Sequence, residues 1–188
     1  MVDTSFAVAS EKQPRVPTTY NHTNGVFQER PRRPIRATPT PPFHGDGGLY
    51  STAQDFGLFM RMMLNGGRLG SVRLLSSKSV RLMMENQIGA IFVEQQPAAD
   101  PLLTNPFPLG AGRDRFGLGF QIAARAEGSS AYRSAGSLSW SGLFNTHFWI
   151  DPRRNVACVM LMQTLPFYDD GAIRTLREFE RNLYRYLN

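Results

Sequence analysis

Cysteine is nearly absent from this sequence of 188 residues, which has only Cys158. A single thiol allows no disulfide bond within the chain, and the apolar run 156–162 around it predicts a buried, unreactive side chain. The three histidines, His22, His44 and His147, do not fall at metal-ligand spacing with this cysteine. We therefore expect no metal site and no cofactor.

Long hydrophobic runs are also missing. No apolar stretch approaches the ~20 residues needed to cross a bilayer, so we expect no membrane span. Residues 1–6 have an acid at position 3 and no basic region leading into an apolar stretch, which does not fit a secretory signal. We expect the chain to be a portion of a longer protein, so its localisation stays open.

Lysine is scarce, and the net charge of +6 comes almost entirely from arginine. The arginines occur singly or in pairs, such as 32–33 and 153–154, without the long basic runs or basic-aromatic motifs of nucleic-acid binders. A basic surface attracts nucleic acid without specificity. We interpret these arginines as solvated surface residues and expect no specific nucleic-acid partner, although a basic nucleic-acid-binding protein remains a third hypothesis.

Proline, glycine and hydrophobic periodicity divide the chain into three regions. Residues 1–48 are rich in proline and predict an extended loop region, whereas residues 49–88 predict a pair of helices. Residues 115–188 predict a sheet followed by a C-terminal helix. A self-standing domain seldom opens with a loop as long as 1–48. We therefore expect the chain to be the C-terminal portion of a larger domain.

The helix boundaries carry recognisable signals. Ser51 is a plausible N-cap, with Gln54 at the position of a capping-box partner. The first helix should end at 65–67, Asn-Gly-Gly, which tolerates left-handed geometry. A second helix should begin near Ser76 or Ser77.

Strand signals follow in the second half. Large apolar residues alternate with glycine and glutamine over 116–122, which predicts one half-buried strand. A further strand is expected around 132–139. Strands over 143–150 and 156–163 are joined by the turn 151–155, Asp-Pro-Arg-Arg-Asn, which makes them antiparallel neighbours.

The last segment, from about Asp169 to Leu187, predicts an amphipathic helix that covers the sheet. Its expected apolar face consists of Ile173, Leu176, Phe179, Leu183 and Leu187. The order of helices, antiparallel sheet and covering helix predicts an α+β fold.

Common catalytic signatures are missing. There is no G-x-S-x-G, no Walker A loop and no H-E-x-x-H. Ser-x-x-Lys is absent too, because the residues three before Lys12 and Lys78 are Ala9 and Leu75.

Six short segments, taken in their order along the chain, nevertheless resemble those of a known family. The segments are 45–56 (GDGGLYSTAQDF), 64–67 (LNGG), 74–80 (LLSSKSV), 116–120 (FGLGF), 140–142 (WSG) and 148–152 (FWIDP). In this order and spacing they resemble the second half of the serine β-lactamase-related hydrolases, which include class C β-lactamases, penicillin-binding-protein-like enzymes and related esterases. The W-x-G form is most similar to the esterase branch, and residues 3–6 resemble the segment shortly after the family's catalytic tyrosine.

The resemblance implies an incomplete β-lactamase/transpeptidase-like fold and a divided active site. In the family, the serine of Ser-x-x-Lys attacks an ester or amide carbonyl, and the lysine and a tyrosine manage its proton. All three would lie outside this chain, which we expect to be inactive alone. Trp140, Ser141 and Gly142 take the place of the third motif and would bind substrate. The backbone N–H of Leu143 would be one of two oxyanion donors.

Other interpretations stay open. By itself, 140–142 is also compatible with a turn that contains a core tryptophan. We interpret His147 as a structural histidine and Tyr20 as a loop residue. A non-catalytic module could use the sheet edge or groove to bind a partner protein or peptide. In the complete protein we expect a small ester or amide substrate, and in the isolated chain self-association through an exposed sheet edge.

Overall fold

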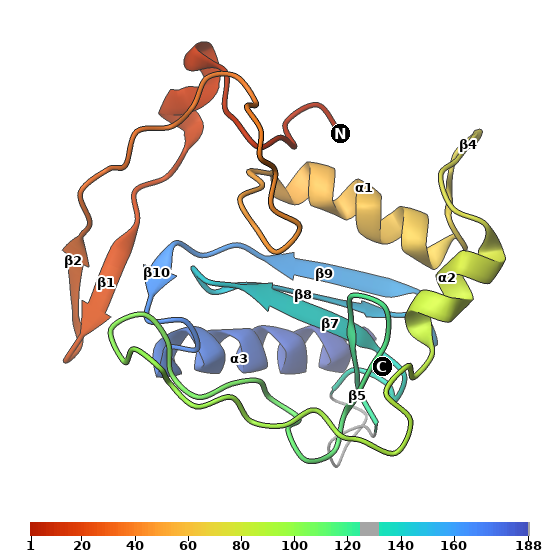
Figure 1. Ribbon diagram of the computed structural model, residues 1–188. Helices are drawn as coiled ribbons and strands as arrows, with labels where there is room; N and C mark the ends of the chain where they lie inside the picture. The colour runs from red at the N-terminus through yellow and green to blue at the C-terminus, as the bar shows by residue number, and fades with distance from the viewer. Residues whose placement is uncertain (125–131, 188) are drawn as a thin grey trace.

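A five-stranded antiparallel sheet with helices on both faces forms the centre of the computed structural model, which describes residues 1–124 and 132–187. Its strands follow chain order: β5 (Arg115–Phe116), β6 (Gln121–Ile122), β7 (Leu138–Gly142), β8 (Thr146–Asp151) and β9 (Val156–Met160). The helix α1 (Ala53–Leu64) lies on one face and α3 (Asp170–Leu187) on the other (Figure 1). The predicted α+β fold, with an antiparallel sheet covered by a C-terminal helix, is confirmed.

Successive side chains of β7 and β8 point to opposite faces of the sheet and pack into two separate cores. Leu138 and Ile150 pack with α1 and with α2 (Ser77–Met84). Trp149, fully buried, packs instead against Leu176 and Tyr184 of α3. Each face of the sheet therefore has its own hydrophobic cluster.

The helices begin and end at the predicted capping residues, except that the N-cap of α1 lies one residue later. Thr52, not Ser51, is the N-cap of α1, and its hydroxyl accepts the N–H of Asp55 at 3.2 Å. The predicted N-cap was therefore wrong by one residue. Ser76 caps α2, and α1 ends before Gly66 and Gly67 at positive φ, as predicted.

Gly67 offers a test of this helix end. Its φ is +90°, and a Cβ placed there would lie 2.2 Å from the carbonyl oxygen of Leu75. We expect Gly67→Ala to lower the free energy of unfolding by about 2–4 kcal/mol, because left-handed strain and a backbone clash add up. Gly70, at φ +59° with open space around its Cβ position, provides the matched control. Urea unfolding of both variants should show a loss of only about 1 kcal/mol for Gly70→Ala; equal losses would contradict the clash.

The strand predictions need three corrections. Residues 116–122 do not form one strand but the hairpin β5–β6, because Gly119 turns the chain at φ +91°. The strand expected around 132–139 is displaced, since β7 begins at Leu138. Likewise β8 begins at Thr146, after a turn, and not at residue 143. The antiparallel pairing of β8 with β9 is confirmed.

The C-terminal helix is amphipathic as predicted, but its buried stripe is rotated. Phe179 and Leu187 are 41% and 44% exposed. The buried positions are Ala172, Leu176, Glu180 and Tyr184. Polar residues enter this stripe because Tyr184 and Glu180 have buried partners: the Tyr184 hydroxyl donates to Asp151 at 3.0 Å, and Glu180 pairs with Arg133.

Residues 1–48 contain more structure than the predicted extended loop. A short 3-10 helix, η1 (Ser10–Arg15), precedes the hairpin β1 (Tyr20–Thr23) and β2 (Val26–Glu29). The strand β1 pairs in parallel with β10 (Thr164–Leu165), so Tyr20 lies in a strand and the loop interpretation was wrong. A two-stranded ribbon, β3 (Arg68–Leu69) and β4 (Val72–Arg73), follows α1.

Candidate functional site

The second half of β7 has an open edge. The strand β6 pairs with β7 only at Leu138 and Ser139, so Trp140–Gly142 extend beyond it. Backbone groups alternate sides along a strand, and those of Ser139 face β6. The backbone of Ser141, two residues on, therefore faces the same side, where no strand of the described chain pairs with it.

A tight turn continues this edge into β8. The N–H of Asn145 donates to the carbonyl of Gly142 at 3.0 Å, and Asn145 adopts φ +60°. This is the pattern of a three-residue hairpin loop whose last residue is left-handed. Leu143 occupies its first position, with a side chain 49% exposed. Its N–H makes no hydrogen bond to any residue that the structure describes.

The structure decides between the two interpretations of 140–142. Trp140 lies in a strand, is 38% exposed and contacts Phe116 edge-to-face at 5.1 Å. It is therefore neither in a turn nor a core residue; the core tryptophan is Trp149. Gly142 has an internal reason for its identity, because a Cβ would lie 2.5 Å from the hydroxyl of Thr146.

Ser141 faces away from Trp140, toward α3. It is paired across the hairpin with His147, and its hydroxyl is hydrogen-bonded to the phenol of Tyr168. The backbone N–H of Leu109 also donates to that phenol, at 3.1 Å. Burial raises the pKa of Tyr168, which keeps its phenol protonated at neutral pH.

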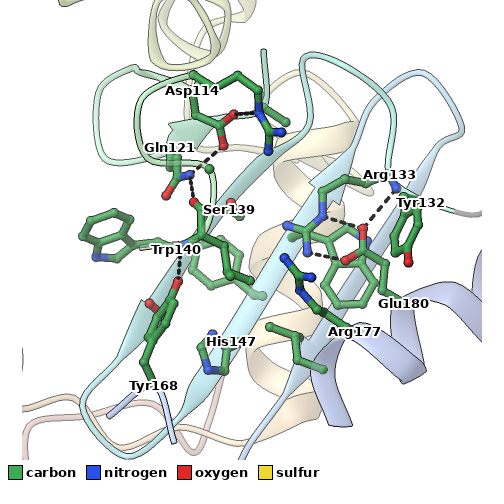
Figure 2. Close-up of a pocket in the computed structure, with 18 residues that line it drawn as sticks. Asp114, Gln121, Tyr132, Arg133, Ser139, Trp140, His147, Tyr168, Arg177 and Glu180 are labelled. Atoms are coloured by element: carbon green, nitrogen blue, oxygen red, sulfur yellow. Dashed lines mark hydrogen bonds and ion pairs between the residues drawn. The ribbon is translucent and has the colours of Figure 1, made fainter. Parts of the chain in front are cut away.

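A cavity of about 100 Å³ lies on the same face of the sheet (Figure 2). Strands β6 to β8, α3 and the segments before β5 and β7 all contribute to its lining. The polar and aromatic residues among them include Asp114, Gln121, Tyr132, Arg133, Ser139, Ser141, His147, Trp149, Tyr168, Arg177 and Glu180. Ser141 thus lies between the open edge of β7 and this cavity, whereas Leu143 does not line it.

The environment of His147 in the cavity strongly perturbs its imidazole. Only 4% of it is exposed, and its Nε2 has no hydrogen-bond partner among the described residues. Burial first, and then the charge of Arg133, lower the pKa of His147 from 6.5 to about 4. The ring is therefore neutral at pH 7.

This shift predicts a pH-dependent stability. Between about pH 6.5 and 4, the unfolded chain binds a proton at His147 that the folded chain does not, so acidification favours unfolding. The free energy of unfolding should fall by up to about 3 kcal/mol across this window. Urea unfolding at several pH values checks this. His147→Phe should flatten the profile, whereas His44→Gln, at an exposed position, should leave it unchanged; identical profiles for the two variants would contradict the assignment.

The sequence-based predictions missed several residues of the site. Asn145 was missed, although Asn at a turn that needs positive φ is a recognisable pattern. Tyr168 and the Arg133–Glu180 pair were missed because residues far apart in the chain bring them together. No group of three or more metal-binding side chains occurs in the described part of the chain, and none of its helices is long and apolar enough to cross a membrane.

Comparison with known proteins places this arrangement in a family. The sequence profile of the family "Beta-lactamase" matches residues 1–182. The chain belongs to the β-lactamase family. Protein Rv1367c of Mycobacterium tuberculosis is 32% identical over 173 residues, which cover 88% of this chain and 40% of that protein.

Solved structures of several other proteins share the fold. Simvastatin synthase (LovD6 mutant) of Aspergillus terreus superposes with a TM-score of 0.72 at 20% identity, over 98% of this chain and 46% of that one. EstCE1, described as a hydrolase with promiscuous acyltransferase activity, gives a TM-score of 0.64 at 17% identity, over 97% and 46%. A β-lactamase (Mb2281c) of Mycobacterium bovis gives 0.54 at 18%, over 74% and 46%. The chain therefore spans less than half the length of these relatives.

Within the β-lactamase family, the resemblance assigned the third motif to Trp140–Gly142 and the oxyanion donor to Leu143. The structure brings these residues together at one end of β7, with Leu143 in the turn that follows. Their roles in catalysis stay predictions.

Proposed function

We propose that this chain is part of a serine hydrolase that cleaves ester or amide bonds through an acyl-enzyme, with the nucleophile of Ser-x-x-Lys on polypeptide outside residues 1–188. One observation carries the proposal: the N–H of Leu143, which has no hydrogen-bond partner among residues 1–124 and 132–187, continues an open strand edge. A carbonyl laid along this edge would meet that donor as its oxygen gains negative charge.

Trp140 supports an ester substrate over a β-lactam. An exposed indole offers an apolar surface and an N–H, but it carries no charge to hold a substrate carboxylate. Phe116, which is half-buried and packs edge-to-face against Trp140, extends this apolar surface. We infer an uncharged, hydrophobic acyl or alcohol group beside Trp140.

A chimera tests the proposal. In the chimera, this chain replaces the matched region of Protein Rv1367c. The chimera is compared with unmodified Protein Rv1367c and with the isolated chain. The isolated chain should neither hydrolyse a p-nitrophenyl ester nor react with a fluorophosphonate probe. The chimera should do both, with the label on the relative's portion. Labelling of the isolated chain at one of its own serines would refute the proposal.

The alternative, a non-catalytic module that binds through its sheet edge, rests on β9. This strand ends the five-stranded sheet of the described residues, and Leu161, just beyond it, is 45% exposed. An open edge can pair with another strand. Concentration-dependent self-association of the isolated chain, together with a folded but unlabelled chimera, would favour this alternative.

A further inference from the structure

Tyr168 adopts a backbone conformation that is unusual for a bulky residue. Its φ is +60°, in the left-handed region, where a Cβ crowds the following carbonyl oxygen. Neighbouring side chains hold this conformation, because the N–H of Tyr168 donates to Oδ1 of Asn145 at 2.9 Å and its carbonyl oxygen accepts the side-chain amide of Asn105 at 3.1 Å. Strained residues persist where their surroundings fix them, and they cluster at functional sites. The side chain that this backbone positions is therefore a candidate for a role in the site.

The side chain of Tyr168 lies beside the edge of β7. It lines the same cavity as Trp140 and Ser141, the first two residues of the third motif (Figure 2). Its ring packs against the rings of His147 and Phe167, with centroids 5.6 and 4.7 Å away. These contacts hold the ring in place, so the phenol oxygen has a defined position relative to the strand.

The phenol of Tyr168 links two hydrogen bonds into a chain. The backbone N–H of Leu109 donates to the phenol oxygen at 3.1 Å, and the phenol is also hydrogen-bonded to the hydroxyl of Ser141. A protonated phenol can accept the N–H of Leu109 and donate its own proton to Ser141 at the same time. The Ser141 hydroxyl then keeps its own proton for a further acceptor. Hydrogen bonds connected in this way strengthen one another.

We propose that Tyr168 is a positioning residue of the candidate active site, whose phenol holds the Ser141 hydroxyl in the orientation that donates to an oxygen of the ester substrate. The inference rests on the proposed function, because it concerns how a substrate is held along β7. A serine side chain without this partner would sample several rotamers. Fixing one of them before the substrate arrives lowers the entropic cost of binding. Tyr168 acts through Ser141, so its contribution falls on substrate binding and not on the chemical step.

Tyr168→Phe in the chimera tests this role, because it keeps the ring and its packing and removes only the hydroxyl. The KM for a p-nitrophenyl ester should rise about five- to tenfold, as expected for the loss of one hydrogen bond. The kcat should stay within about twofold, since loss of uniform binding raises KM alone. A residue that merely supports the fold would instead disturb the turn that presents Leu143, and its loss would lower kcat.

Two further variants of the chimera make the test specific. Tyr184→Phe is the matched control: it also removes a buried phenol, which is hydrogen-bonded to Trp149 and Asp151, but Tyr184 does not line the cavity. It should leave KM and kcat within about twofold. Ser141→Ala should raise KM about as much as Tyr168→Phe does, and combining the two should raise it no further. An unchanged KM for Tyr168→Phe, a loss of kcat alone, or factors that multiply in the combined variant would overturn the proposal.

Failure of the proposed function gives a different result. The unmodified chimera would then neither hydrolyse the ester nor react with the fluorophosphonate probe, and both proposals would fall together. An active chimera in which Tyr168→Phe changes nothing removes the positioning role alone.

The link between Tyr168 and Ser141 can also be measured without activity. Urea unfolding of residues 1–188 gives the stability of Tyr168→Phe, Ser141→Ala and the combined variant. Because the two side chains share a hydrogen bond, the loss caused by Tyr168→Phe should be smaller when Ser141 is already alanine. Additive losses would overturn the positioning role whatever the activity of the chimera.

Discussion

Replacing Leu143 by proline is expected to lower the kcat of ester hydrolysis by the chimera about 10²–10³-fold, with a small change in KM. Proline removes the N–H that we assign to the oxyanion hole, and loss of one such donor costs about 3 kcal/mol of transition-state stabilisation. The effect falls on kcat because the donor interacts mainly with developing charge.

The local geometry makes this substitution unusually clean. Leu143 is the second residue of the turn that the bond from Asn145 to Gly142 closes, a position at which proline is favoured in type I turns. Its N–H has no partner within the described chain, so folding loses no hydrogen bond. Proline therefore removes the donor while the hairpin keeps its shape.

Leu143→Ala is the matched control, since it removes the exposed side chain and keeps the N–H. It should retain kcat within about threefold, because surface truncations usually have small effects. Steady-state kinetics with one p-nitrophenyl ester and thermal unfolding of both variants give the comparison. Equal kcat values for the two variants would exclude the backbone of Leu143 from the oxyanion hole.

The sequence predicted those parts of the fold that local signals determine. The helix end at 65–67 and the turn at 151–155 were correct because glycine, asparagine and proline have few alternatives there. The single strand over 116–122 was wrong, since alternation alone cannot distinguish one strand from a hairpin folded at Gly119. Gly117 added a constraint that no pattern reveals: a Cβ there would lie 2.2 Å from the carbonyl of Met83.

The candidate site likewise contains residues that a local motif predicted and residues that only the fold brings together. Trp140, Ser141, Gly142 and Leu143 were found because they are contiguous and a family motif marks them. The cavity behind them could not be predicted, because α3, the segments before β5 and β7, and three strands all contribute to it. The residues at the edge of β7 were therefore predictable from the sequence, whereas the cavity beside them was not.

The turn that presents Leu143 depends on one buried side chain. Asn145 is fully buried; its Nδ2 donates to the carbonyls of Thr164 at 3.0 Å and Pro166 at 2.8 Å, and its Oδ1 accepts the N–H of Tyr168 at 2.9 Å. These bonds tie the tip of the β7–β8 hairpin to the segment that leads into α3. The left-handed backbone of Asn145 fits this role, because asparagine tolerates that conformation well.

Asn145→Asp should therefore lower the free energy of unfolding by about 3–5 kcal/mol at pH 7. The change keeps the shape and the tolerance of positive φ, but it replaces two donors by a buried negative charge facing carbonyl oxygens. Such a carboxyl has a raised pKa in the folded state, so the loss should shrink as the pH falls and the group is protonated.

Asn155→Asp provides the control, since Asn155 also has a positive φ, of 54°, but is exposed in the turn between β8 and β9. It should cost less than about 0.5 kcal/mol. Urea unfolding at pH 7 and at pH 4 separates the two variants. If the losses are equal, backbone conformation and not the buried hydrogen bonds fixes the hairpin. If only Asn145→Asp is damaging, the position of the Leu143 amide depends on contacts made more than twenty residues further along the chain, at Pro166 and Tyr168.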